Sequence, residues 1–176
     1  MTRAVVTHMR RQGGGRIINI GSVLGFLPAP YMALYSASKH AIEGYSESLD
    51  HELRTRGIRV SVVEPAYTRT RFEANLLEPD SKLDEYEAVR GALSKRMKDL
   101  LAEADEPGVV AAVVLKVARA ARPKLRYTAG SLVGRVGWLR RFAPARLVDA
   151  GIRRDLLMDR LTASPRRTPV VATSTR

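Results

Sequence analysis

Two short apolar runs on either side of a long helical pattern constrain the fold of this chain more than any other feature. Residues 17–20 are almost continuously hydrophobic, residues 58–63 are apolar apart from Arg59 and Ser61, and residues 32–56 between them show helical periodicity. Gly57 stands where the C-terminal cap of such a helix belongs. Strands that are apolar on both faces are typical of a parallel sheet covered by helices. The order strand, helix, strand therefore predicts an α/β fold.

The rest of the chain extends this alternation. The further elements that we expect are a helix over 2–11 stopped by the glycines at 13–15, a polar helix over 81–104, a helix from Pro107 to about 121, a third strand over 125–129, and one or two basic amphipathic helices over 132–161. The end of the chain, from about residue 162, is rich in Pro, Thr and Arg, which predicts disorder.

The net charge of +12 belongs entirely to the last third of the chain. Residues 1–115 hold equal numbers of basic and acidic side chains, whereas residues 116–176 hold 15 basic residues against three acidic ones. The neutral first part argues against a nucleic-acid partner, and no known nucleic-acid motif is present. The basic last third of the chain is compatible with binding to an anionic partner.

Composition excludes several other classes. The chain has no cysteine, which rules out disulfides and thiolate metal sites, and its three histidines are too scattered to form a metal cluster. No apolar run approaches the roughly 18 residues of a membrane span, and the N-terminus does not resemble a secretory signal. We therefore expect a cytoplasmic protein that holds no metal.

Three residues suggest chemistry. Tyr35 and Lys39 are four residues apart in the predicted helix, so their side chains share one face. An ammonium group beside a phenol favours the phenolate, which equips a tyrosine for proton transfer. Ser22 follows the first predicted strand, at the edge where ligands bind in open parallel sheets. Taken singly, each residue also suits an ordinary structural role. Tyr35 suits a half-buried aromatic position, Lys39 a solvated position on a helix, and Ser22 a turn.

The segments around these residues resemble one family. GRIINIGSVLG at 15–25, YSASK at 35–39, GYSESL at 44–49, GIRV at 57–60 and PAYTRT at 65–70 stand in the order found in short-chain dehydrogenases/reductases. The likeness is close over about residues 1–75 and loose over 106–130. It implies a partial Rossmann-type, doubly wound parallel sheet of about three strands, with a helical C-terminal extension. The implied divisions are a Rossmann-type part at 1–130, a substrate lid at 131–161 and a disordered tail at 162–176.

The resemblance implies an NAD(P)-dependent oxidoreductase that moves a hydride between nicotinamide and an apolar alcohol or ketone. Tyr35 would be the general acid/base and would bind substrate together with Ser22, which orients the reacting oxygen. Lys39 would assist Tyr35 and bind the nicotinamide ribose. The cofactor would be NAD or NADP, and the residues implied to bind it are Tyr35, Lys39, Pro65, Thr68 and Thr70.

Two departures from the family pattern stand out. Ala66 occupies a position where the family usually has glycine. The family's glycine-rich dinucleotide turn is missing, since the glycines at 13–15 follow a predicted helix rather than a strand. We expect that turn and four strands to belong before Met1, so that this chain alone is a truncated form with weak or no cofactor binding and activity.

Partners are suggested by two segments. Small residues line one face of the helix over 32–56, at Ala37, Ala41, Gly44 and Ser48, and the resemblance implies a homo-oligomer paired through this helix. Residues 138–161 mix apolar side chains with arginines, which suits either a lid over an apolar substrate or peripheral contact with an anionic membrane. The alternative function is a non-catalytic remnant that binds a membrane surface or a partner protein through these helices.

Overall fold

A parallel sheet of three strands forms the centre of the structure, a computed structural model that describes residues 1–72, 75, 80–156 and 158. The strands are β1 (Gly15–Ile20), β2 (Ile58–Pro65) and β3 (Arg126–Ala129), in the spatial order β1-β2-β3. The register pairs Ile20 with Val63 and Pro65 with Ala129. The α/β fold with parallel strands predicted from the apolar runs is confirmed.

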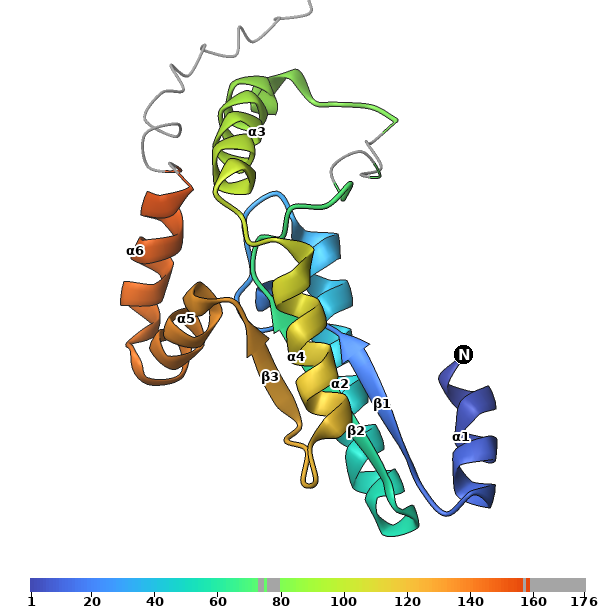
Figure 1. Cartoon of the computed structure of the whole chain (residues 1–176). Helices are drawn as coiled ribbons and strands as arrows, with labels where there is room; N and C mark the ends of the chain where they lie inside the picture. The colour runs from blue at the N-terminus through green and yellow to red at the C-terminus, as the bar shows by residue number, and fades with distance from the viewer. Residues whose placement is uncertain (73–74, 76–79, 157, 159–176) are drawn as a thin grey trace, which may run out of the picture.

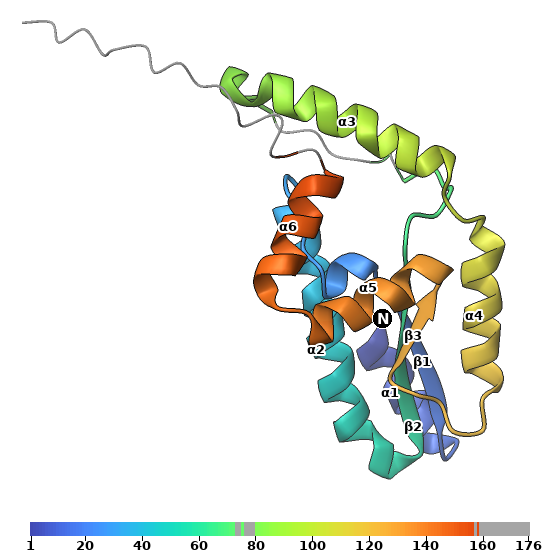
Figure 2. The ribbon, with the colours of Figure 1, turned by 90° about the vertical axis from the view of Figure 1, so that its left-hand side faces the viewer.

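Helices cover both faces of the sheet (Figure 1). α2 (Ala33–Leu53) lies on one face and α4 (Pro107–Arg119) on the other, as the turned view in Figure 2 also shows. α1 (Thr2–Arg11) packs on the same side as α2. A short 3-10 turn, η2 (Arg54–Arg56), continues α2, and Gly57 then takes a left-handed conformation with φ 71° that leads into β2.

Each face of the sheet has its own apolar cluster. Ile17, Ile58 and Val60 pack with side chains of α1 and α2, namely Val6, Met9, Leu49 and Leu53. On the other face, Val63 and Ala129 pack with Val117 of α4 and its neighbours. Alternate residues of β2 serve opposite faces, which explains why apolar residues stand on both faces of this strand.

The deepest face of α2 is polar. The buried residues of this helix are Ser36, Glu43, Ser46 and Asp50, whereas its apolar side chains Ile42, Leu49 and Leu53 are only half-buried. Burial of polar side chains is tolerated where they find partners. Asp50 illustrates this at the far end of the helix.

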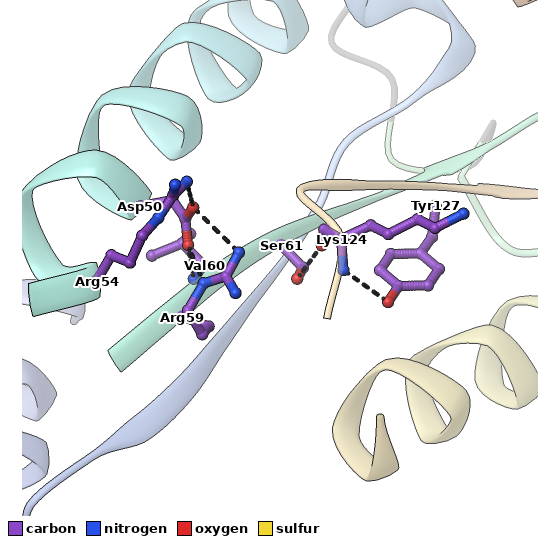
Figure 3. A network of polar contacts seen from close by, with 7 residues as sticks. All are labelled: Asp50, Arg54, Arg59, Val60, Ser61, Lys124 and Tyr127. Atoms are coloured by element: carbon purple, nitrogen blue, oxygen red, sulfur yellow. Dashed lines mark hydrogen bonds and ion pairs between the residues drawn. The ribbon is translucent and has the colours of Figure 1, made fainter. Parts of the chain in front are cut away.

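Asp50 joins the end of α2 to the start of β2 (Figure 3). Its carboxylate accepts hydrogen bonds from Arg54 at 2.6 Å, from Arg59 at 2.9 Å and from the backbone N–H of Val60 at 2.9 Å. Burial alone would raise the pKa of Asp50, but these donors outweigh it and hold the pKa at about 2.

A second link in Figure 3 joins β2 to the turn before β3. The hydroxyl of Ser61 donates to the carbonyl oxygen of Lys124 at 2.7 Å, and the N–H of Lys124 donates to the hydroxyl of Tyr127 at 2.9 Å. These contacts fix the turn before β3 against the middle of β2, directly before the paired residues Val62 and Arg126.

Three helices lie near the carboxyl ends of the strands (Figures 1 and 2). They are α3 (Glu87–Ala102), α5 (Ser131–Phe142) and α6 (Ala145–Asp155). Arg96 of α3 pairs with Asp155 of α6 at 3.0 Å. The predicted lid segment thus contains two described helices, whereas the predicted disordered tail over 162–176 lies outside the described residues.

Candidate active site

Ser22 lies two residues beyond β1, in the turn formed by residues 21–25, called here the serine turn. It begins the 3-10 turn η1 (Val23–Gly25), and its Oγ accepts a hydrogen bond from the N–H of Leu24 at 3.1 Å. The side chain is largely buried, with 8% exposed. A hydroxyl that accepts one bond still has its own proton to donate, so Ser22 can bind an oxygen of a ligand.

Tyr35 and Lys39 stand one turn apart near the start of α2. The Nζ atom of Lys39 lies 5.6 Å from the centre of the Tyr35 ring. It also donates a hydrogen bond to the carbonyl oxygen of Ile20, the last residue of β1, at 3.2 Å. Burial lowers the pKa of Lys39. The structure therefore brings the Tyr–Lys pair to the strand end that leads into the serine turn.

The segment from Pro65 to Thr70 follows the neighbouring strand end. Thr68 is half-buried and pairs with Asp105 in an isolated parallel bridge, and its hydroxyl donates to the carbonyl oxygen of Ala66 at 3.3 Å. Thr70 is exposed, and its Oγ1 accepts a bond from the N–H of Phe72 at 3.3 Å. Two loops at adjacent strand ends thus present hydroxyl groups on the same edge of the sheet.

Phe72 is a site residue that sequence reasoning missed. Its ring stands edge-on to the ring of Tyr35, with centroids 5.4 Å apart. An aromatic pair of this geometry restricts the orientation of both rings. The only sequence signal was an apolar residue two positions after Thr70, which does not by itself predict a contact with α2.

Three charged residues beneath the serine turn were missed as well. Glu43 and Glu64 are buried, with 7% and 4% exposed, and Arg126 lies between them. Glu43 follows Lys39 by four residues in α2, so a signal existed in the helical spacing. The partners on β2 and β3 could not be inferred without the strand register.

The donor set at this edge fits the nicotinamide end of a dinucleotide. Hydroxyl groups such as those of Thr68 and Thr70, and an ammonium group such as that of Lys39, are of the kind that can hydrogen-bond a carboxamide and ribose hydroxyls. Within the described residues, no group of three or more His, Cys, Asp or Glu side chains is arranged to bind a metal ion. Nor does any described helix combine the length and apolar character needed to cross a bilayer.

A Rossmann-type parallel sheet with a Tyr–Lys pair beside one strand end defines the class of this protein. Comparison with known proteins agrees, because the family model described as short chain dehydrogenase matches residues 1–81. The chain is 34% identical over 138 residues to an uncharacterized oxidoreductase of Schizosaccharomyces pombe, covering 78% of this chain and 57% of that protein.

Two further matches extend the likeness. A 3-ketodihydrosphingosine reductase of Bacteroides thetaiotaomicron is 33% identical over 135 residues, which cover 76% of this chain and 50% of that one. The crystal structure of a short-chain dehydrogenase from Streptomyces avermitilis superposes with a TM-score of 0.64 at 27% identity, covering 90% of this chain and 56% of that chain. The chain belongs to the short-chain dehydrogenase/reductase family and spans about half the length of the curated relatives it matches.

Proposed function

We propose that this chain carries the catalytic residues of an NAD(P)-dependent oxidoreductase that interconverts an apolar alcohol and its carbonyl compound. The observation that carries the proposal is the Tyr35–Lys39 pair, held at the end of β1 by the hydrogen bond from Lys39 to Ile20. Membership of the family supports the same reaction class.

Each residue has a distinct task in this proposal. Tyr35 donates a proton to the carbonyl oxygen during reduction and takes it back from the alcohol during oxidation. Lys39 stabilises the phenolate form of Tyr35 with its positive charge and binds ribose hydroxyls of the cofactor. Ser22 donates a hydrogen bond to the reacting oxygen and orients it toward Tyr35. A bound nicotinamide would supply or accept the hydride.

Pro65, Thr68 and Thr70 are proposed to hold the carboxamide. The pairing of this loop with Asp105 fixes its backbone, since the N–H of Arg69 donates to the carbonyl oxygen of Asp105 at 2.9 Å. The N–H of Asp105 in turn donates to the carbonyl oxygen of Tyr67 at 3.2 Å. A rigid backbone of this kind presents its groups in one orientation, which selects the face of the ring that reacts.

An apolar substrate is supported by two aromatic side chains, one against Tyr35 and one directly after the serine turn. Phe72 lies against its ring, and Phe26 follows the serine turn and faces α5, where a Cβ on Gly137 would lie 3.7 Å from the Phe26 ring. The reductase of Bacteroides thetaiotaomicron, named for a keto compound, is consistent with this class.

The proposal is tested by measuring oxidation of NADH and NADPH by this chain with a panel of apolar ketones. We expect weak cofactor binding and slow turnover, because the sequence has no Gly-x-Gly-x-x-Gly turn between a strand and a helix to bind the pyrophosphate. Turnover that requires a cofactor supports the proposal. A folded sample that oxidises neither cofactor at millimolar concentration contradicts it for this chain.

The C-terminal helices allow a second, non-catalytic proposal. Trp138, Phe142 and Leu147 are 63%, 62% and 60% exposed, and arginines surround them on α5 and α6. Exposed aromatic and basic side chains together suit an anionic membrane surface, whereas a lid would turn its apolar side chains toward the site. Sedimentation with phosphatidylcholine vesicles, with and without phosphatidylserine, separates the two. Binding only to the anionic vesicles, lost in Trp138→Ser, favours the membrane, and no binding favours the lid.

We further propose that the chain forms a homo-oligomer through α2. The small residues of the predicted stripe, Ala37, Ala41, Gly44 and Ser48, are all exposed in the single chain. A Cβ added at Gly44 would meet no atom within 4 Å, so we expect the single chain to accommodate Gly44→Leu. Sedimentation velocity should show an oligomer in the wild type and a smaller species in Gly44→Leu. A monomeric wild type contradicts the proposal.

A further inference from the structure

Arg126 bridges three glutamates beneath the serine turn. Its Nε lies 2.9 Å from Oε2 of Glu43 and 3.8 Å from Oε1 of Glu64, and its Nη2 lies 2.8 Å from Oε2 of Glu47. The carboxyl groups of Glu43 and Glu64 are buried, whereas the side chain of Glu47 is 47% exposed. The group therefore joins α2, β2 and β3 at one point.

Glu43 also lies directly against the serine turn. A Cβ added at Gly21 would stand 2.9 Å from Oε1 of Glu43, and one added at Gly25 would stand 3.0 Å from its Cγ. The same Oε1 atom is buried and has no hydrogen-bond partner among the described residues. Glycine at both ends of the serine turn, at positions 21 and 25, is what permits this close approach.

The charges of the group do not balance when every member is ionised, because three carboxylates face one guanidinium. Burial, followed by the charge of Glu43, raises the pKa of Glu64 to about 7, although Arg126 opposes the shift. Burial also raises the pKa of Glu43, against the opposing effects of Arg126 and His40, while Glu47 adds to the rise. Near neutral pH, Glu64 thus keeps much of its proton.

We propose that Glu43, held by Arg126, is a positioning residue that fixes the serine turn on α2 and so sets the place of Ser22 relative to Tyr35. Lys39 precedes Glu43 by one helical turn, so one face of α2 carries both the lysine of the site and the support of the serine turn. Ionisation of Glu64 above neutral pH adds a second buried negative charge beside Glu43 and loosens that support. The consequence for catalysis rests on the proposed function, whereas the effect on the turn does not.

Amide hydrogen exchange measured by NMR tests the effect on the turn. The N–H groups of Gly21 and Gly25 donate to the carbonyl oxygens of Val63 and Ser22, each at 2.8 Å, and that of Leu24 donates to Oγ of Ser22. In Glu43→Ala, protection of these three amides should fall about 10-fold or more, while the amide of Val60, bound to Asp50, stays protected. Glu43→Gln, which keeps the shape of the side chain, should restore most of the protection.

Glu47→Ala is the matched control. It also removes a carboxylate from Arg126, but Glu47 lies one helical turn beyond Glu43 and its side chain is 47% exposed, so protection of the serine turn should change less than about 2-fold. Equal effects of Glu43→Ala and Glu47→Ala on the serine turn would overturn the proposal. So would a loss of protection in Glu43→Ala that is spread evenly over the whole sheet.

The same hydrogen-exchange measurement, repeated at several pH values, tests the role of Glu64. Protection factors, which are already corrected for the intrinsic effect of pH, should fall at the serine turn between about pH 6 and pH 8 in the wild type. In Glu64→Gln, which cannot ionise, they should stay constant over the same range. An identical fall in both proteins would overturn the role of Glu64.

Activity measurements separate this inference from the proposed function. Where the wild type turns over, Glu43→Ala should lower kcat about 10-fold with a smaller change in KM for the cofactor, and Glu43→Gln should recover part of it. Unchanged kcat in Glu43→Ala would overturn the positioning role. A wild type without turnover, in which Glu43→Ala still loosens only the serine turn, would refute the proposed function and leave the contact itself established.

Discussion

The ammonium group of Lys39 donates a hydrogen bond to the carbonyl oxygen of Ile20, 3.2 Å away, and so ties α2 to the last residue of β1. The contact spans 19 positions of the sequence and joins the helix that carries Tyr35 to the strand that leads to Ser22. Partial burial lowers the pKa of Lys39, and the hydrogen bond to Ile20 gives the half-buried ammonium group a partner.

Replacing Lys39 with methionine keeps most of the side chain's volume and removes its charge. We expect turnover to fall roughly 100-fold, because Tyr35 loses the cation that favours its phenolate. Lys39→Arg keeps the charge and should retain more activity than Lys39→Met. Steady-state kinetics at several cofactor concentrations check this, and equal rates in the two variants would contradict a role for the charge.

Replacing Phe72 with alanine should affect kcat more than stability. Phe72 is 42% exposed, so its removal creates no closed cavity and should cost about 1 kcal/mol or less in the free energy of unfolding. The loss of the edge-on contact leaves the Tyr35 ring free to turn, and we expect kcat to fall about 5-fold. Urea unfolding and initial rates measured on the same samples separate these effects. A fall in stability without a fall in kcat would count against the contact.

Asp50 should account for part of the acid sensitivity of the fold. Its pKa is about 2 in the native state and near 3.8 when unfolded, so its ionised form stabilises the fold above pH 4. That contribution, about 2 kcal/mol, should be lost as pH falls through 2. Asp50→Asn should be less stable at pH 7 and should show a shallower decline between pH 4 and pH 2. Urea unfolding at several pH values measures both, and parallel curves for the two proteins would contradict the assignment.

Glu64 should make the fold less stable as pH rises, which is the opposite of the effect of Asp50. Its pKa is raised to about 7, so the native state holds a proton that the unfolded chain releases near pH 4.5. Stability should therefore fall as pH rises from about 5 to 7, by up to about 3 kcal/mol. In Glu64→Gln this decline should be absent. Thermal unfolding of both proteins across this pH range measures the decline in stability. A decline that persists in Glu64→Gln would show that another group causes it.

The strands and the main helices could be predicted because each follows from local patterns. Apolar runs at 17–20 and 58–63 indicated buried strands, and both were found, extended by a few residues at their ends. The strand expected over 125–129 forms from Arg126, and the helix expected to reach about 121 ends at Arg119. Ends of elements depend on tertiary contacts that a local pattern does not contain.

The candidate site was only partly predictable for a related reason. Tyr35 and Lys39 share a helix face by spacing alone, so their proximity could be expected. The contact of Glu43 with Gly21 and the bridge to Arg126 depend on how α2 lies over the sheet and on the register of β3. No periodicity encodes those distances, because they arise from packing between distant segments.

The central claim is that Tyr35 transfers the proton in a nicotinamide-dependent reaction. Its most direct test is the rate of NADPH and NADH oxidation with apolar ketones by the wild type and by Tyr35→Phe, at equal cofactor saturation. We predict slow but measurable turnover in the wild type and a loss of roughly 100-fold or more in Tyr35→Phe, with cofactor binding nearly unchanged, because only the phenolic hydroxyl is removed. Turnover by Tyr35→Phe at close to the wild-type rate would contradict the claim.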